Sequence, residues 1–158
     1  MSRRPHGRSS GAASAAGFTL IELLVVVTII AIATAAVSLS LRDGASAQLE
    51  REAERLAGLF EMARAESRAA GVPVQWLPLV DDANGDQFRF LGLPPAEALP
   101  NRWLGGEVAV QIVGARSVRL GPEPMIGAQR VILSLGSQQL VLSTDGLSPF
   151  RVDPVPAS

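Results

Sequence analysis

The sequence predicts an α+β protein in which one long N-terminal helix precedes a β-rich antiparallel head. An apolar run from Phe18 to Leu41 predicts a helix whose first half is transmembrane. A stripe of apolar residues at steps of four and three, from Leu49 to Ala70, predicts an amphipathic second half. From Val72 onward, short alternating runs are separated by Gly, Pro and Asn, which is typical of antiparallel strands and turns.

The apolar run contains one ionisable residue, Glu22. As a helix the run would span about 36 Å, at about 1.5 Å per residue, and a bilayer core is about 30 Å thick. A carboxylate at bilayer depth costs at least about 2.5 kcal/mol. We therefore expect Glu22 to have a partner.

The distribution of charge predicts the orientation of the chain. All 14 basic residues are Arg, and three of them, Arg3, Arg4 and Arg8, precede the apolar run, where there is no acid. The positive-inside rule places residues 1–17 in the cytoplasm and exports the C-terminal body. After Gly17 the chain keeps 11 Arg against 15 acids. This acidic body is a poor electrostatic partner for nucleic acid, which we do not expect to bind.

Three interpretations fit the N-terminus. In the first it is a secretory signal peptide, with Ala33-Thr34-Ala35 as the cleavage pattern. In the second it is a plain signal anchor. In the third the chain is cut after Gly17, and the apolar helix stays with the mature protein. Only the third gives Glu22 a partner, because the cut would leave Phe18 with a cationic α-amine one helical turn away. The helix dipole also favours a carboxylate in the first turn.

The second half of the helix is predicted to pack against the head. Its stripe consists of Leu49, Ala53, Leu56, Phe60, Ala63, Ser67 and Ala70, widened by Leu59 and Met62. On the sides expected to face water, three i,i+3 ion pairs are possible: Arg51/Glu54, Glu52/Arg55 and Glu61/Arg64. Gly71 and Pro73 predict the end of the helix. In the head, Trp103 is expected to anchor the Gly- and Pro-rich segment 92–107.

Metal binding and catalysis are the two kinds of chemistry to consider for the head. The acidic loop Asp81 to Asp86 contains Asn84-Gly85, a strong hairpin signal. Val80 and Leu91 occupy positions where a standard EF-hand loop needs acids, so only an irregular calcium site stays open there. Catalysis is not expected, because the chain has no Cys and its one His, His6, lies in the segment to be removed. No cofactor is expected.

The stretch Gly17-Phe18-Thr19-Leu20-Ile21-Glu22-Leu23-Leu24-Val25-Val26 resembles the class III signal of type IV pilins and type II secretion pseudopilins. In that superfamily a prepilin peptidase cuts after the Gly and N-methylates the new Phe. The resemblance implies cleavage between Gly17 and Phe18, methylation of Phe18, and a role for Glu22 in assembly. An amine of one subunit that pairs with Glu22 of its neighbour would also set the register between packed helices.

Further segments resemble the H-type minor pseudopilin of type II secretion: 55–67, 71–74 and 142–152. The resemblance implies a subunit at or near the tip of a periplasmic pseudopilus, which helps to export folded proteins across the outer membrane. Implied partners are other major and minor pseudopilins, the prepilin peptidase/methyltransferase, the inner-membrane assembly platform and exported substrates. The alternative is a minor pilin of a type IV pilus, acting in assembly or DNA uptake. Against DNA binding, the Arg residues after Leu41 are dispersed in sequence, and the C-terminal segment offers only Arg151.

The predicted organisation follows from these segments. It consists of a cytoplasmic leader that is removed (1–17), a transmembrane helix (18–41), its periplasmic continuation (42–71), an antiparallel β head (72–153) and a flexible tail (154–158). The expected location is the cell inner membrane as a single-pass protein, with incorporation into a periplasmic filament.

Overall fold

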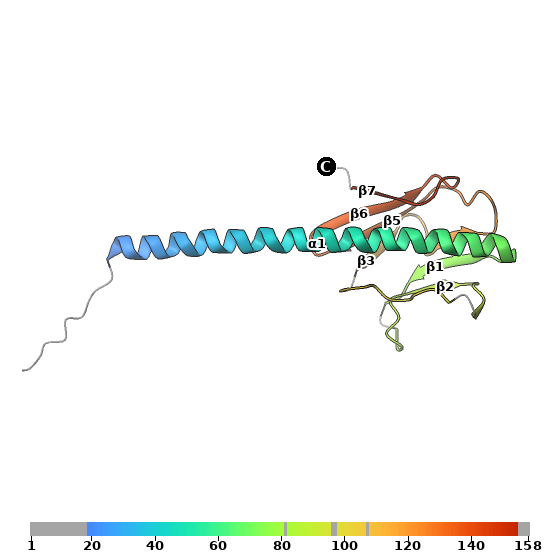
Figure 1. Ribbon diagram of the computed structural model, residues 1–158, viewed down its shortest axis with the longest axis horizontal. Coiled ribbons are helices and arrows are strands. Elements are labelled where there is room, and N and C mark those ends of the chain that lie inside the picture. The colour runs from blue at the N-terminus through green and yellow to red at the C-terminus, as the bar shows by residue number, and fades with distance from the viewer. Residues whose placement is uncertain (1–18, 81, 96–97, 107, 155–158) are drawn as a thin grey trace, which may run out of the picture. The chain divides into compact units, whose positions relative to one another are not determined.

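The computed structural model of the chain describes residues 19–80, 82–95, 98–106 and 108–154 (Figure 1). It divides into two compact units, Met1–Ser38 and Leu39–Ser158. The predicted leader 1–17 and the last residues of the predicted tail lie outside the described residues. Each unit is considered by itself.

One helix, α1, runs from Leu20 to Ala70, as predicted. Its end is set by Gly71, which has a φ of +66°. This left-handed conformation is easily adopted by Gly and commonly terminates helices. The backbone N–H of Val72 then donates to the carbonyl oxygen of Ser67 at 3.2 Å, so one of the last helical carbonyls keeps a partner.

The seven strands of the described residues form two sheets in the second unit. The first sheet has the order β2-β1-β4, from β1 (Val74–Pro78), β2 (Phe88–Leu91) and β4 (Val118–Gly121). The second has the order β3-β5-β6-β7, from β3 (Ala109–Ile112), β5 (Gln129–Leu135), β6 (Gln138–Thr144) and β7 (Arg151–Pro154). Every strand pair is antiparallel. The predicted α+β class and antiparallel head are therefore confirmed.

The two sheets flank the part of α1 that runs through the head (Figure 1). Alternate residues of the strands face this helix, which is why Val74 and Trp76 of β1 and Val131 and Leu133 of β5 are fully buried. Phe60 lies at the centre. Its ring meets that of Trp76 at 5.1 Å and that of Phe150 at 4.8 Å, both edge to face. One helical side chain thus packs against the first sheet and against the segment that leads into the second.

The predicted helix stripe is confirmed from Leu49 to Ser67, whose members other than Met62 are buried, whereas its last member, Ala70, is exposed. Met62, predicted to widen the stripe, is 58% exposed. Two charged residues assigned to the water-facing sides, Glu52 and Arg64, are buried at 1% and 3% exposure. These assignments were wrong because loops distant in sequence cover Glu52 and Arg64 on opposite edges of the stripe, whereas Met62 lies further round the helix and stays exposed.

Candidate functional site: the first turn and the loop contacts of the helix

Thr19 precedes α1 and caps its first turn. The backbone N–H of Glu22 donates to Thr19 Oγ1 at 3.3 Å, and that of Leu23 donates to the Thr19 carbonyl oxygen at 3.2 Å. Thr-x-x-Glu is the pattern of a capping box, in which a carboxylate also compensates the unpaired N–H groups at a helix start. An amine was the partner predicted for Glu22, and this local role was overlooked although the spacing from Thr19 was visible in the sequence.

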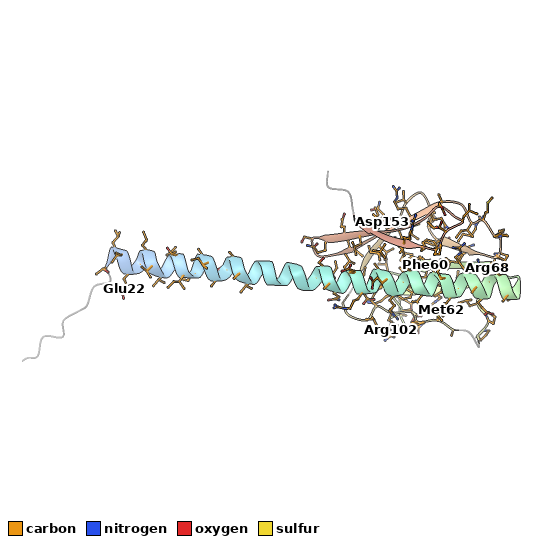
Figure 2. The ribbon with its side chains drawn as sticks, turned by 45° about the horizontal axis from the view of Figure 1, so that its top comes forward. Glu22, Phe60, Met62, Arg68, Arg102 and Asp153 are labelled. Atoms are coloured by element: carbon orange, nitrogen blue, oxygen red, sulfur yellow. The ribbon has the colours of Figure 1, made fainter. Side chains whose placement is uncertain are left out.

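Glu22 lies on the first turn of α1 (Figure 2), in a segment that is long and apolar enough to cross a membrane. The window Leu20–Val37 has a mean hydropathy of 2.7, and none of it is buried within the chain. The hydroxyl of Thr28 donates to the Leu24 carbonyl oxygen, and that of Thr34 to the Ile30 carbonyl oxygen, each at 2.8 Å. These hydroxyls are satisfied by their own helix, so lipid or another helix can cover the segment.

The predicted cleavage and methylation residues, Gly17 and Phe18, lie outside the described residues. Both the cut after Gly17 and the pairing of the Phe18 amine with Glu22 therefore stay predictions. Within the described residues the site consists of an acid in a capped first turn, followed by an uncovered apolar helix.

In the head, Glu52 connects α1 to the loop before β3. Its Oε1 accepts hydrogen bonds from the backbone N–H groups of Leu104 at 2.6 Å and Gly105 at 3.0 Å. One turn away on either side, the Gln48 amide donates to the Gly105 carbonyl oxygen, and Arg55 donates to that of Arg102 at 3.0 Å. Trp103, between these contacts, is buried against Phe88 at 4.8 Å, which confirms its predicted role as an anchor.

A second set of contacts connects the helix to the segment before β7. Glu61 Oε1 accepts from the Phe150 backbone N–H at 3.1 Å, and the Arg64 guanidinium donates to the Ser148 carbonyl oxygen at 3.3 Å. Arg64 also pairs with Glu61 at 3.2 Å, as its spacing predicted. Polar residues beside the apolar stripe thus fix two loops of the head. No local signal in the sequence predicts these contacts, because their partners lie 47 to 89 residues away.

In the acidic loop between β1 and β2, the carboxylates pair with an arginine of the same chain. Arg89 pairs with Asp86 at 3.0 Å and Asp82 at 3.7 Å, and Asn101 donates to Asp86 at 2.6 Å. The predicted hairpin is confirmed, with the loop carrying a turn in which Gly85 N–H donates to the Asp82 carbonyl oxygen. Asp81 lies outside the described residues, within which there is no group of three His, Cys, Asp or Glu side chains placed to hold a metal ion.

Comparison with known proteins gives one family match. Residues 13–38 match the model described as the prokaryotic N-terminal methylation motif. This match confirms the N-terminal part of the resemblance, a methylation motif, and does not separate a pseudopilin from a minor pilin. Among solved structures, the chain is similar to the type IV minor pilin FimU of Pseudomonas aeruginosa strain PAO1, at 14% identity and a TM-score of 0.47, over 68% of this chain and 88% of that one. No curated protein matches the chain.

Proposed function

We propose that the chain is a minor pseudopilin, a subunit at or near the tip of the pseudopilus in a type II secretion system, where it helps to export folded proteins. The observation that carries this proposal is the position of Glu22. It is the single charged residue of a membrane-length apolar helix, and it lies in the first turn, inside the matched methylation motif.

In this proposal a prepilin peptidase/methyltransferase cuts after Gly17 and methylates Phe18. The new amine is cationic near neutral pH and pairs with Glu22 of a neighbouring subunit, which lowers the cost of placing that carboxylate among apolar residues. The exposed apolar face from Leu20 to Val37 supplies the remaining contact, first with lipid and then with the helices of other pseudopilins.

The head extends into the periplasm and presents its surface to neighbouring subunits and exported substrates. Support for a rigid head comes from the hydrogen bonds of Glu52, Glu61 and Arg64, which hold loops from different parts of the chain on one helix. A filament subunit benefits from such fixed loops, because repeated contacts require the same surface on every copy.

The first test is the N-terminus of the mature protein, determined by intact mass and N-terminal sequencing of membrane-extracted chain. We expect it to begin at Phe18 with a methylated amine. A chain that begins near Ala36 would instead show that the apolar segment is an ordinary signal peptide and would overturn the proposal.

The second test separates secretion from a pilus. The alternative, a minor pilin of a type IV pilus, has the same motif and would be processed in the same way. We expect a deletion strain to lose export of secreted proteins and to keep twitching and DNA uptake. The reverse pattern would assign the chain to a pilus.

A further inference from the structure

Two arginines far apart in sequence lie in one row across the second sheet. In the strand register Arg130 of β5 is opposite Ser143 of β6, and Ser143 is opposite Arg151 of β7. Directly opposed residues project from the same face of a sheet. Since Val131 and Leu142, their neighbours in sequence, are buried against the helix, this row faces away from it. With strands about 4.8 Å apart, the two arginines stand about 10 Å apart.

Both arginines are exposed, and neither forms an ion pair within the described parts of the chain, where the paired arginines are Arg55, Arg64 and Arg89. The two acids nearest the row have other hydrogen-bond partners. Asp153 accepts from the Ser143 hydroxyl at 2.9 Å, and Asp145 accepts from residues of its own turn. The arginines also line a surface hollow of about 390 Å³ with Gln129, Ser143 and the acid Asp145. The row thus carries two cations without an ion pair in the described residues, of which Arg151 is also attracted by the Asp145 carboxylate.

A complementary pattern occurs on the exposed side of α1 where the helix enters the head. Glu50 and Glu54 are exposed, lie one turn apart on the same side, and form no ion pair with any described residue. Their carboxylates, on flexible side chains, can spread to the spacing of the two arginines. Arg51, also exposed, lies between them in sequence, and its predicted pair with Glu54 is not formed. The helix therefore presents two adjacent anions with a cation to one side, whereas the sheet presents two cations on either side of Ser143, whose hydroxyl is bound to the Asp153 carboxylate.

We propose that the row Arg130–Ser143–Arg151 of one chain binds Glu50 and Glu54 of a second copy of the same chain. The inference rests on the proposed function, because it describes a contact between filament subunits. The two surfaces are different, so the contact is heterologous and places one copy behind the other near the tip of the filament. A long polyanion fits the row less well, since Asp145 and Asp153 would repel its charges.

The test uses the absence of cysteine in the chain. Two full-length copies with different tags are co-expressed, one with Ser143→Cys and the other with Ala47→Cys, and isolated membranes are oxidised. Ala47 is exposed and lies one turn before Glu50. We expect a disulfide-linked dimer that contains both tags. The matched control is Gln139→Cys, which lies on the same strand and face as Ser143 but four residues away from it, and which should give about tenfold less of the mixed dimer.

Charge reversal then tests the ion pairs. We expect Arg130→Glu with Arg151→Glu, or Glu50→Arg with Glu54→Arg, each to lower the cross-linking rate about tenfold. When the first pair is placed on one tagged copy and the second on the other, the rate should recover. Native fluorescence of Trp76 and Trp103 verifies that each variant folds.

Unchanged cross-linking in both reversed variants would overturn the proposal, as would equal yields from the Gln139→Cys and Ser143→Cys variants. A third overturning result is a row that binds heparin or short duplex DNA in an Arg130- and Arg151-dependent way without any mixed dimer. Failure of this contact is distinguishable from failure of the proposed function, because processing at Phe18 and export are measured separately.

Discussion

Glu52 Oε1 accepts a 2.6 Å hydrogen bond from the backbone N–H of Leu104, across 52 residues of chain. Glu52 is 1% exposed, and its other oxygen has Arg55 at 3.6 Å as its ion-pair partner. A carboxylate removed from water in this way is retained when it satisfies backbone donors that would otherwise be buried without partners. The residue therefore determines the position of the loop that carries Trp103 and the exposed Leu104.

We expect Glu52→Ala to lower the free energy of unfolding of the head by about 1–3 kcal/mol, because the N–H groups of Leu104 and Gly105 lose their acceptor. Glu52→Gln keeps an acceptor oxygen and should cost less. The measurement is denaturant unfolding of the full chain in detergent, followed by fluorescence. The two Trp residues both lie in the head, so the signal reports on that unit alone.

The matched control for this change is Glu54→Ala, two residues further along the helix and exposed. It should change the free energy of unfolding by no more than about 0.5 kcal/mol. Equal effects at Glu52 and Glu54 would contradict the role assigned to the buried carboxylate.

A second prediction concerns the aromatic centre of the head. Phe60→Ala should lower the free energy of unfolding by about 3–5 kcal/mol. Phe60 is fully buried between Trp76 and Phe150, and the surrounding residues cannot collapse into the space that Ala would leave. Phe60→Leu should retain part of this stability, and Met62→Ala, at a site 58% exposed, should retain nearly all of it. A comparable loss in Met62→Ala would mean that the helix packs with a different face.

The third prediction is that the stability of the head depends on pH through the turn before β7. Backbone hydrogen bonds from Ser148 and Leu147 hold the pKa of Asp145 below its ordinary value of 3.8. Because the folded pKa is lowered, the ionised group stabilises the fold above pH 3.8, and this contribution disappears as the pH falls through the folded value. The melting temperature, followed by thermal unfolding from neutral to acidic pH, should fall less in Asp145→Asn than in wild type across that window. Parallel curves for the two proteins would exclude the effect.

The packing of the adjacent residue, Gly146, explains why this turn contains a Gly. Its φ is +94°, and a Cβ atom there would lie 2.6 Å from the backbone of Gly127. The pair Asp145-Gly146 is typical of a turn, because Gly tolerates positive φ. The reason for the Gly is clear only once the chain brings Gly127 against it.

The sequence predicted the elements well because each depends on local periodicity. Leu49, Leu56 and Phe60 recur at helical spacing, and Val131 and Leu133 alternate, so their buried faces follow from the pattern itself. It could not predict which parts of the helix surface the loops cover. Glu52 and Met62 flank the same stripe, yet only Glu52 lies under a loop, and that loop starts about 50 residues later.

The arginine row illustrates the same limit. Arg130 and Arg151 were treated as dispersed because they are far apart in the chain. The register of the β5–β6 hairpin and of the β6–β7 pair brings both beside Ser143. Register depends on turn geometry and on which face is buried, so the grouping is visible only once the strands are paired.

The last prediction separates two roles of Glu22. A capping role alone tolerates Gln at this position, because a Gln side chain also serves in a capping box. Pairing with the Phe18 amine requires the negative charge. We expect Glu22→Gln, like Glu22→Ala, to insert into the membrane normally and to lower export of a secreted protein about tenfold, because a buried ammonium would lose its counter-ion.

Thr19→Ala is the matched control, since it removes the Oγ1 acceptor at the start of α1 and leaves the charge of Glu22 in place. It should lower the stability of the helix by about 1 kcal/mol. It should affect export much less than Glu22→Gln does, because the continuous apolar segment keeps the helix formed in lipid. Membrane fractionation and secreted-protein activity are measured in the same cultures. If Glu22→Gln exports at the wild-type level while Thr19→Ala does not, the acid serves the helix cap and the amine needs no carboxylate partner.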